Sequence, residues 1–366
     1  AIKKSGPRKQ KKALKSIRRR NRVESKRNRN RNLSDKDKSL ILSNLLAKTI
    51  RDLWPNLSEQ LKRIFDPRKC KDYTIDEIIF AGIAMFMFKR GSRNAMNSSA
   101  RDNNFKRNFF QLFKFRIPHM DTVDDVLCKL SDKELDHLRI AMVRVLLERK
   151  LLRDFRFNNT YYLVAIDATG VMTANADDEG TLRKESKNKV VSYTRQVLEA
   201  KIITPFGMSI SIGSEWLQTE RVSGCDESAE KIKEDCELNG FKRLSVKLKT
   251  HYPKLAICII ADGLYANEPF IKICKSNKWK FCVVLKDKKL KTNWDQVEQQ
   301  LIETEAKNDV NNMILEDSST IEWITNLKFK DQLLSWIQCS ESRSDMGCPK
   351  KIFFLTDLWT QIFKFS

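Results

Sequence analysis

Two short apolar runs constrain the fold of this chain more than any other feature of its sequence. Residues 161–167 (YYLVAID) and 255–263 (LAICIIADG) each reach an aspartate after a series of mostly apolar side chains. A continuous apolar run of this length is typical of a strand that is buried on both faces of a mixed or parallel sheet. Open α/β sheets bind ligands at the carboxyl ends of their strands. We therefore expect Asp167 and Asp262 to share a divalent metal site.

The length and composition favour a soluble globular protein. The chain has 366 residues, of which 41% are hydrophobic and 32% charged, which is enough for two or three domains with cores of their own. The longest apolar stretch, residues 78–88, is shorter than the roughly 18 residues that a membrane span needs. It also lies too far along the chain for a signal peptide. We expect a cytoplasmic protein with no membrane partner and a buried helix at this stretch.

The cysteines and histidines argue against a zinc site. Nine cysteines are scattered singly without a CxxC pair, and the chain has only three histidines. We expect reduced, mostly buried thiols.

Positive charge is the strongest compositional signal. The chain carries 69 basic and 47 acidic residues, a net charge of +22. Residues 1–32 hold 15 of the basic residues and one acid, so this arm contributes +14 and the rest of the chain +8. Such a chain is expected to bind nucleic acid. The candidate DNA contacts are Arg18, Arg19, Arg20, Arg22, Lys26 and Arg27 in the arm, with Arg90 and Arg93 further on. A solvated tail without a specific partner is the alternative for residues 1–33.

Residues 34–152 have the spacing of a helical N-terminal domain. Thr74 followed by Glu77 is a capping-box signature ahead of the apolar run 78–88, and residues 89–94 read as a basic loop between two helices. A series of phenylalanines follows, which we assign to the core in preference to a platform for stacking bases: Phe105, Phe109, Phe110, Phe113 and Phe115.

Residues 153–285 alternate strands and helices. Residues 197–203 and 208–216 form a hairpin signal, and a helix from Asp226 is expected to end at Gly240. The Asp262 strand, a helix over 268–276 and a strand over 280–285 follow. This order of strand, hairpin, helix, strand, helix, strand matches a ribonuclease H-like core, in which the first and fourth strands are parallel neighbours.

That arrangement would place the two aspartates a few ångströms apart, since neighbouring strands are separated by about 4.8 Å. Without a cation the two carboxylates would repel each other and one pKa would rise. Mg²⁺ accepts carboxylate oxygens, and a two-ion site supports phosphodiester chemistry. Taken singly, an aspartate after a strand is more often a turn or cap residue. The acids Asp177, Asp178 and Glu179 are assigned to a solvated loop.

Several blocks together resemble DDE transposases of bacterial insertion sequences, most closely the insertion-sequence-four type with a β-rich insertion. Residues 162–170 (YLVAIDATG) resemble the strand with the first acid of that family, and residues 260–266 (IADGLYA) resemble the block with its second acid. The hairpin, the first core helix and the helical domain are matched by shorter blocks, at residues 198–202, 210–215, 235–238, 241–244, 91–94 and 118–125. The resemblance runs from about residue 80 to residue 357.

This resemblance implies cut-and-paste movement of double-stranded DNA. Mg²⁺ or Mn²⁺ would support hydrolysis at the ends of the element and then attack on target DNA, with Asp167 and Asp262 as catalytic metal ligands. Two-ended chemistry implies a homodimer on DNA, and DNA binding implies association with the nucleoid. The implied organisation is an α/β ribonuclease H-like core with a mixed sheet, preceded by an all-α domain and interrupted by a β-rich insertion. The expected parts are 1–33 (arm), 34–152 (helical), 153–285 (core), 286–357 (insertion) and 358–366 (aberrant tail).

The sequence departs from the family pattern at three places. Ala168 stands where a glycine is usual, and Arg195-Gln196 stand near the position of a usual histidine. The block with the family's catalytic glutamate is missing after residue 357, so we expect a C-terminally truncated copy. Glu298, Glu303 and Glu305, on a plausible helix over 293–306, are the substitutes within the chain, although surface acids are the favoured assignment.

Three functions therefore stay open. The chain is an active DDE transposase, a truncated remnant that binds DNA without cutting it, or a basic nucleic-acid-binding protein whose paired acids are incidental. Trp294, Trp323 and Trp336 are assigned to core packing in preference to stacking on bases.

Overall fold

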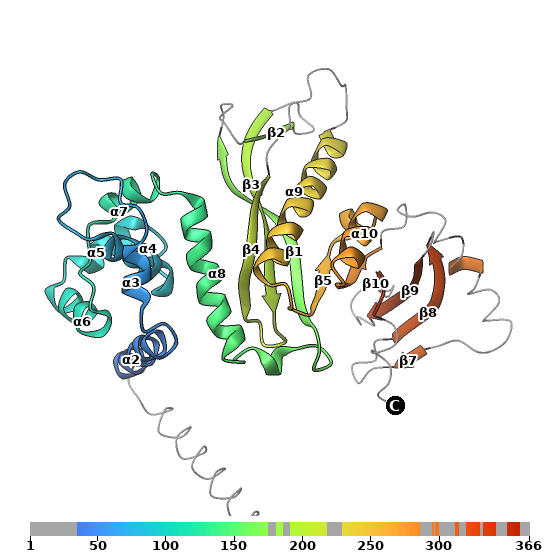
Figure 1. Cartoon of the computed structure of the whole chain (residues 1–366), viewed down its shortest axis with the longest axis horizontal. Helices are drawn as coiled ribbons and strands as arrows, with labels where there is room; N and C mark the ends of the chain where they lie inside the picture. Colours follow the sequence, from blue (N-terminus) through green and yellow to red (C-terminus); the bar gives the residue numbers. More distant parts are fainter. Residues whose placement is uncertain are drawn as a thin grey trace, which may run out of the picture. The chain divides into compact units, whose positions relative to one another are not determined.

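The computed structural model describes residues 35–174, 181–185, 191–217, 229–285, 295, 297–299, 312–314, 320–329, 332–341 and 350–358. The chain divides into two compact units, Ala1–Leu138 and Arg139–Ser366 (Figure 1). The fold is mixed α/β, with helices alone in the described part of the first unit and a mixed sheet in the second.

The first unit is built from helices joined by short connections. Its elements are α2 (Asp35–Leu53), α3 (Leu57–Lys62), α4 (Ile75–Met87), α5 (Arg93–Ala100), α6 (Asn103–Phe113) and α7 (Met120–Leu127), followed by the first turns of α8 (Asp132–Glu148). The buried helix expected at residues 78–88 is α4. Its capping box is present, with the Glu77 carboxylate accepting a hydrogen bond from the Thr74 backbone N–H at 3.0 Å.

Aromatic rings surround α4. Phe80 stacks on Phe115 at 4.3 Å between ring centroids and contacts Phe113 at 5.3 Å. Phe109, Phe113 and Phe115 are buried, which confirms their assignment to the core. The assignment is wrong for Phe110, which is 48% exposed because it lies on the outer side of α6.

Ten strands of the described residues join in one mixed sheet. Their order is β2-β3-β1-β5-β6-β10-β9-β8-β7, with β4 also paired to β3. Among these described strands, the pairs β1–β5 and β5–β6 are parallel and the other pairs are antiparallel. The strands are β1 (Tyr162–Ala174), β2 (Leu182–Glu185), β3 (Val191–Ile203), β4 (Ser209–Leu217), β5 (Ile257–Ala261), β6 (Lys280–Val284), β7 (Asn312–Ile314), β8 (Thr320–Phe329), β9 (Gln332–Glu341) and β10 (Lys350–Thr356).

The apolar runs at residues 161–167 and 255–263 are neighbouring parallel strands, as expected. Their register pairs Tyr162 with Ile257 and ends with Ile166 opposite Ala261. The prediction that Asp167 ends the first strand is wrong, because β1 continues to Ala174. Beyond Ile166 the strand leaves β5 but stays hydrogen-bonded to β3, and this second ladder keeps it extended.

Helix α9 (Ala229–His251) packs against β4, and its length corrects a second prediction. Gly240 lies inside this helix and does not end it. A Cβ added at Gly240 would come within 2.4 Å of a methyl carbon of Leu217 on β4. The glycine therefore permits close packing of helix on strand, which in sequence looks the same as a helix stop.

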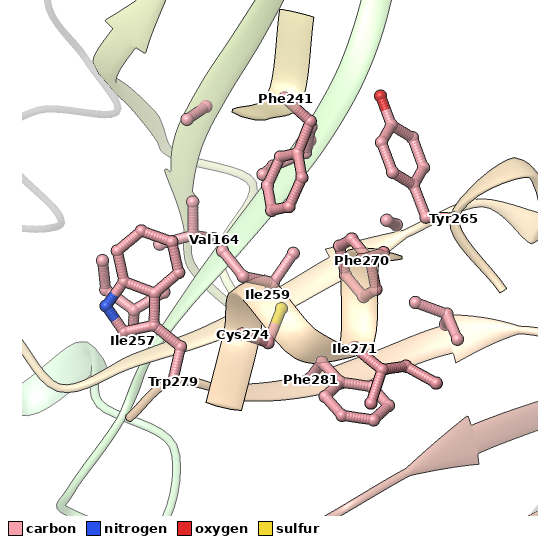
Figure 2. Packing of buried hydrophobic residues seen from close by; sticks show 14 of the residues in the cluster. Val164, Phe241, Ile257, Ile259, Tyr265, Phe270, Ile271, Cys274, Trp279 and Phe281 are labelled. Carbon is pink, nitrogen blue, oxygen red and sulfur yellow. The ribbon is translucent and has the colours of Figure 1, made fainter. Parts of the chain in front are cut away.

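Figure 2 shows the core between the sheet and the helices α9 and α10 (Glu268–Ser276). Phe270 of α10 contacts Phe241 of α9 at 5.0 Å and Phe281 of β6 at 5.8 Å, and all three are fully buried. Burying one such ring stabilises the fold by about 1.5–3 kcal/mol. The aromatic cluster thus holds both helices on the parallel part of the sheet.

The strands after residue 286 extend this same sheet. β10 pairs antiparallel with β6, with Leu355 opposite Val283, and β9, β8 and β7 follow outward. Trp336 on β9 is buried and stacks on Phe353 of β10, so its assignment to the core is confirmed. Trp323 is partly buried, and Trp294 lies outside the described residues.

Candidate functional site

The structure places Asp167 and Asp262 next to one another. Ile166 and Ala261 form the last parallel pair between β1 and β5, so each aspartate is the next residue at the same edge of the sheet. Adjacent strands lie about 4.8 Å apart. Both aspartates are exposed, while Ile166 and Ala261 before them are buried. The two carboxylates therefore share one solvent-accessible position at the carboxyl end of β5.

Backbone hydrogen bonds help to orient both side chains. One oxygen of Asp262 accepts a hydrogen bond from the Leu264 N–H at 2.9 Å and caps the short helix η2 (Gly263–Tyr265). One oxygen of Asp167 accepts from the Ala168 N–H at 3.0 Å. Asp262 is thus a cap residue, as the alternative interpretation of a single aspartate expected. This role is compatible with metal binding, because a carboxylate has a second oxygen with which to bind a cation.

A buried tyrosine and a third carboxylate lie near the pair. Tyr265, in the turn after Asp262, is 2% exposed, and its hydroxyl has no hydrogen-bond partner among the described residues. Burial raises the pKa of Tyr265 well above its usual range, and the charges of Glu237, Asp262 and Asp167 raise it further. The three carboxylates are therefore close enough to act electrostatically on one phenol. Glu237, on α9, is 4% exposed.

Glu237 and Tyr265 were not among the site residues predicted from the sequence. The usable signal is the spacing on α9, where Glu237 precedes the buried Phe241 by four residues and so shares its face. The ring of Phe241 contacts that of Tyr265 at 5.8 Å (Figure 2). Without the fold, nothing indicates that this helix face approaches the turn after β5.

The donor set suits a hard cation with water ligands. Mg²⁺ is commonly bound through one or two carboxylates and keeps several waters, which fits Asp167 and Asp262. Among the described residues, no group of three or more histidine, cysteine, aspartate or glutamate side chains is placed to hold a metal ion. Glu237 therefore does not complete an inner coordination shell in this structure.

Of the three glutamates proposed as substitutes for a third ligand, the structure describes Glu298. Glu298 is exposed beside the buried Val297, as expected of a surface acid. Glu303 and Glu305 lie outside the described residues, as do Asp177, Asp178 and Glu179.

The candidate DNA contacts are described only in part. Arg18, Arg19, Arg20, Arg22, Lys26 and Arg27 lie outside the described residues. Arg90 is exposed in the connection between α4 and α5. Arg93 begins α5 and forms an ion pair with Asp124, so this arginine has a structural partner within its own unit. The expected loop over 89–94 is therefore shorter, because Arg93 and Asn94 are helical.

Cys70, Cys128, Cys258, Cys274 and Cys282 are thiols that form no disulfide. Burial raises the pKa of Cys258, Cys274 and Cys282, the last to about 12, so they are protonated at neutral pH and poor metal ligands. The prediction of buried thiols is wrong for Cys70 and Cys128, which are exposed on the helical unit. In the part of the chain that is described, no helix is long and apolar enough to cross a membrane.

Comparison with known proteins does not assign the chain to a family. No protein-family model matches the chain, and no curated protein matches it.

Proposed function

We propose that this protein is a DNA transposase of the DDE class, which binds double-stranded DNA and carries out metal-dependent phosphodiester hydrolysis and strand transfer. The observation that carries the proposal is the position of Asp167 and Asp262, which directly follow Ile166 and Ala261, the last parallel pair of β1 and β5. An incidental pair of acids has no reason to meet at this edge of the sheet, where α/β folds bind ligands.

The arrangement of elements supports the same proposal. The strands β4, β3, β1, β5 and β6 follow one another across the sheet, and α9 connects β4 to β5. This is the order expected of a ribonuclease H-like core. The all-α region before it and the strands β7–β10 after it agree with the organisation implied by the resemblance to insertion-sequence-four transposases.

The chemistry follows from the two carboxylates. Asp167 and Asp262 would hold Mg²⁺ or Mn²⁺ with oxygen ligands, and the Leu264 N–H fixes the orientation of Asp262. The bound ions would activate the attacking oxygen and stabilise the leaving oxygen of the phosphodiester. Because both aspartates are exposed, a duplex can approach them without opening the fold. The net charge of +22 favours binding of the DNA backbone.

A second candidate function is DNA binding without cleavage, by a transposase remnant. It is favoured by one specific observation, namely that the described residues bring no third carboxylate into the inner shell of an ion. A basic nucleic-acid-binding protein whose acids are incidental is the remaining alternative.

A nicking assay tests the proposal. Purified protein of residues 1–366 is incubated with supercoiled plasmid and Mn²⁺, beside Asp167→Asn, Asp262→Asn and a control, Asp357→Asn, which alters a carboxylate at the opposite edge of the sheet. We expect nicking to fall more than about 100-fold in the first two variants, because even partners outside the inner shell are worth about 10- to 100-fold.

The alternatives give different results in the same assay. DNA binding without nicking, together with Mn²⁺ binding that depends on Asp262, would favour the remnant. DNA binding with no dependence on either aspartate, in nicking or in metal binding, would leave only the basic nucleic-acid-binding protein.

A further inference from the structure

Basic residues gather in the segments that lead into the three parallel strands. Residues 149–161 precede β1, residues 249–256 precede β5, and residues 275–280 lead into β6. Together these segments hold nine basic residues and one acid, Asp154. Residues 33–366 as a whole have a net charge of +8, so the rest of this part of the chain is balanced. The net positive charge outside the N-terminal arm is therefore concentrated in the three segments.

The fold brings the three segments to one edge of the sheet, which we call the basic edge. Because β1, β5 and β6 are parallel neighbours, their amino ends lie side by side, about 4.8 Å from one strand to the next. Hydrogen bonds to backbone carbonyls join these parts of the chain: from the Tyr162 N–H to Ala256 at 2.8 Å, from the Lys249 ammonium to Asn277 at 3.2 Å, and from the Arg144 guanidinium of α8 to His251 at 3.0 Å. The charges of the three segments thus belong to one surface.

Three exposed lysines of the basic edge have no acid to neutralise them. Lys254, Lys275 and Lys278 are exposed, and none of them forms an ion pair with a residue in the described ranges. Lys280, by contrast, is paired with Asp357 at 3.2 Å. Like charges on one surface repel each other and lower the stability of the compact state. An anion from outside the chain would relieve this repulsion.

We infer that the basic edge binds the phosphate backbone of double-stranded DNA through Lys254, Lys275 and Lys278. A duplex presents one negative charge for about every 1.7 Å of its axis, so several phosphates can meet neighbouring cations at once. This inference goes beyond the proposed function and shares with it only the partner, DNA.

The basic edge is separate from the proposed cation site. The five residues of β5 lie between the basic edge and Asp262, a distance of about 16 Å at about 3.3 Å per residue. This distance exceeds the Debye length of about 8 Å at physiological ionic strength, so the lysines do not offset the charge of the aspartates through the solvent. The basic edge therefore contacts phosphates other than the one at the cation site, and it needs no metal ion to do so.

The salt dependence of DNA binding tests the inference. The affinity of the full chain for a short DNA duplex is measured by fluorescence anisotropy at several salt concentrations, with EDTA to remove divalent cations. The double variant Lys254→Gln/Lys278→Gln is compared with a control, Lys328→Gln/Lys351→Gln, which removes the same charge from exposed positions on β8 and β10. We expect the log–log salt slope to become shallower by about 2 in the first variant and to stay unchanged in the control, because each phosphate contact contributes about 0.9. A change no larger than that of the control overturns the inference.

Chemical acetylation of lysines, mapped by mass spectrometry with and without the duplex, tests the same contact without any substitution. DNA should slow the modification of Lys254, Lys275 and Lys278 several-fold and leave that of Lys328 unchanged. Full reactivity of the three lysines in the DNA complex overturns the inference. Protection by phosphatidylserine vesicles and not by DNA would assign the surface to a membrane and overturns it as well.

Failure of this inference and failure of the proposed function give different results. If Asp262→Asn abolishes nicking while the double variant keeps the salt slope of the control, the basic edge does not bind DNA and the proposed function stands. If DNA protects the three lysines and the unchanged protein does not nick the plasmid, the basic edge binds DNA and the proposed cleavage is wrong.

Discussion

Aspartates occupy both edges of the central sheet, and their surroundings differ. At one edge Asp262 is exposed and caps a short turn beside a second acid, Asp167. At the other edge Asp357, directly after β10, has a side chain that is only 11% exposed and accepts hydrogen bonds from the Phe281 N–H at 2.9 Å and the Lys280 ammonium at 3.2 Å. An acid that meets a lysine and a backbone donor, as Asp357 does, holds the fold together. The acids at the other edge are the ones that we propose to bind a cation.

The largest expected difference between the two edges is in stability. Asp357→Ala should lower the free energy of unfolding by about 3 kcal/mol, because it leaves Lys280 without its carboxylate and the Phe281 N–H unsatisfied. Asp262→Ala should cost less than about 1 kcal/mol, the value of an exposed cap. Urea unfolding followed by tryptophan fluorescence measures both. Equal losses would contradict the division into a structural and a functional edge.

The pH dependence of stability gives a second difference, this time between Asp357 and Glu77 of the helical unit. Burial would raise the pKa of Glu77, but hydrogen bonds from Arg116 and from the Thr74 N–H lower it below its ordinary 4.5. Its ionised form therefore stabilises the fold above pH 4.5, and this contribution is lost as the pH falls through the lowered value. Half of the Arg116 side chain is exposed, which limits the size of the effect.

Asp357 should behave in the opposite way. Burial raises its pKa above 3.8 despite the bonds from Phe281 and Lys280, so the folded state binds a proton more tightly than the unfolded state does. Its contribution to stability therefore increases as the pH falls through the raised value toward 3.8. Unfolding of Glu77→Gln and Asp357→Asn, measured from pH 7 to pH 3, should show opposite changes of slope relative to the unchanged protein. Slopes that change in the same direction would contradict the comparison.

The smallest expected effect is an unchanged or slightly raised stability, whereas most substitutions lower the stability of a protein. Asp167→Asn removes one of two neighbouring like charges at an exposed position, so it should leave stability unchanged or raise it by up to about 0.5 kcal/mol in the absence of divalent cations. Thermal unfolding in the presence of a chelator measures this change, with Asp357→Ala as the variant that should lose stability. A loss above about 1 kcal/mol in Asp167→Asn would show that this acid, too, is structural.

The sequence predicted those parts of the fold that depend on local patterns. Two continuous apolar runs were enough to place β1 and β5 side by side, and the spacing of Thr74 and Glu77 predicted the start of α4. The end of β1 could not be predicted, because the strand is prolonged by a ladder with β3 and not by its own apolar pattern. Gly240 was assigned to the end of a helix because local sequence does not reveal the approach of Leu217.

The residues of the candidate site, too, could be predicted only where a local sequence pattern marks them. Asp167 and Asp262 could be selected because each directly follows an apolar run in sequence. Glu237 and Tyr265 could not, since their proximity depends on how α9 crosses the turn after β5. The partners of Asp357, Lys280 and Phe281, precede it by 77 and 76 residues, and this long-range contact leaves no local signal.

The continuation of β1 beyond Asp167 has a consequence for the dynamics of the site. Asp167 lies within a strand whose hydrogen bonds to β3 extend to Ala174, whereas Asp262 lies on a turn. Side chains on strands are held more accurately than those on loops. In the proposed cation site, Asp167 would thus be fixed in space while Asp262 could adjust, so the site could follow changes in the spacing of the ions during the proposed reaction. Slow amide exchange at the β3-paired residues around Asp167, and faster exchange at Leu264, would be the signature of this asymmetry.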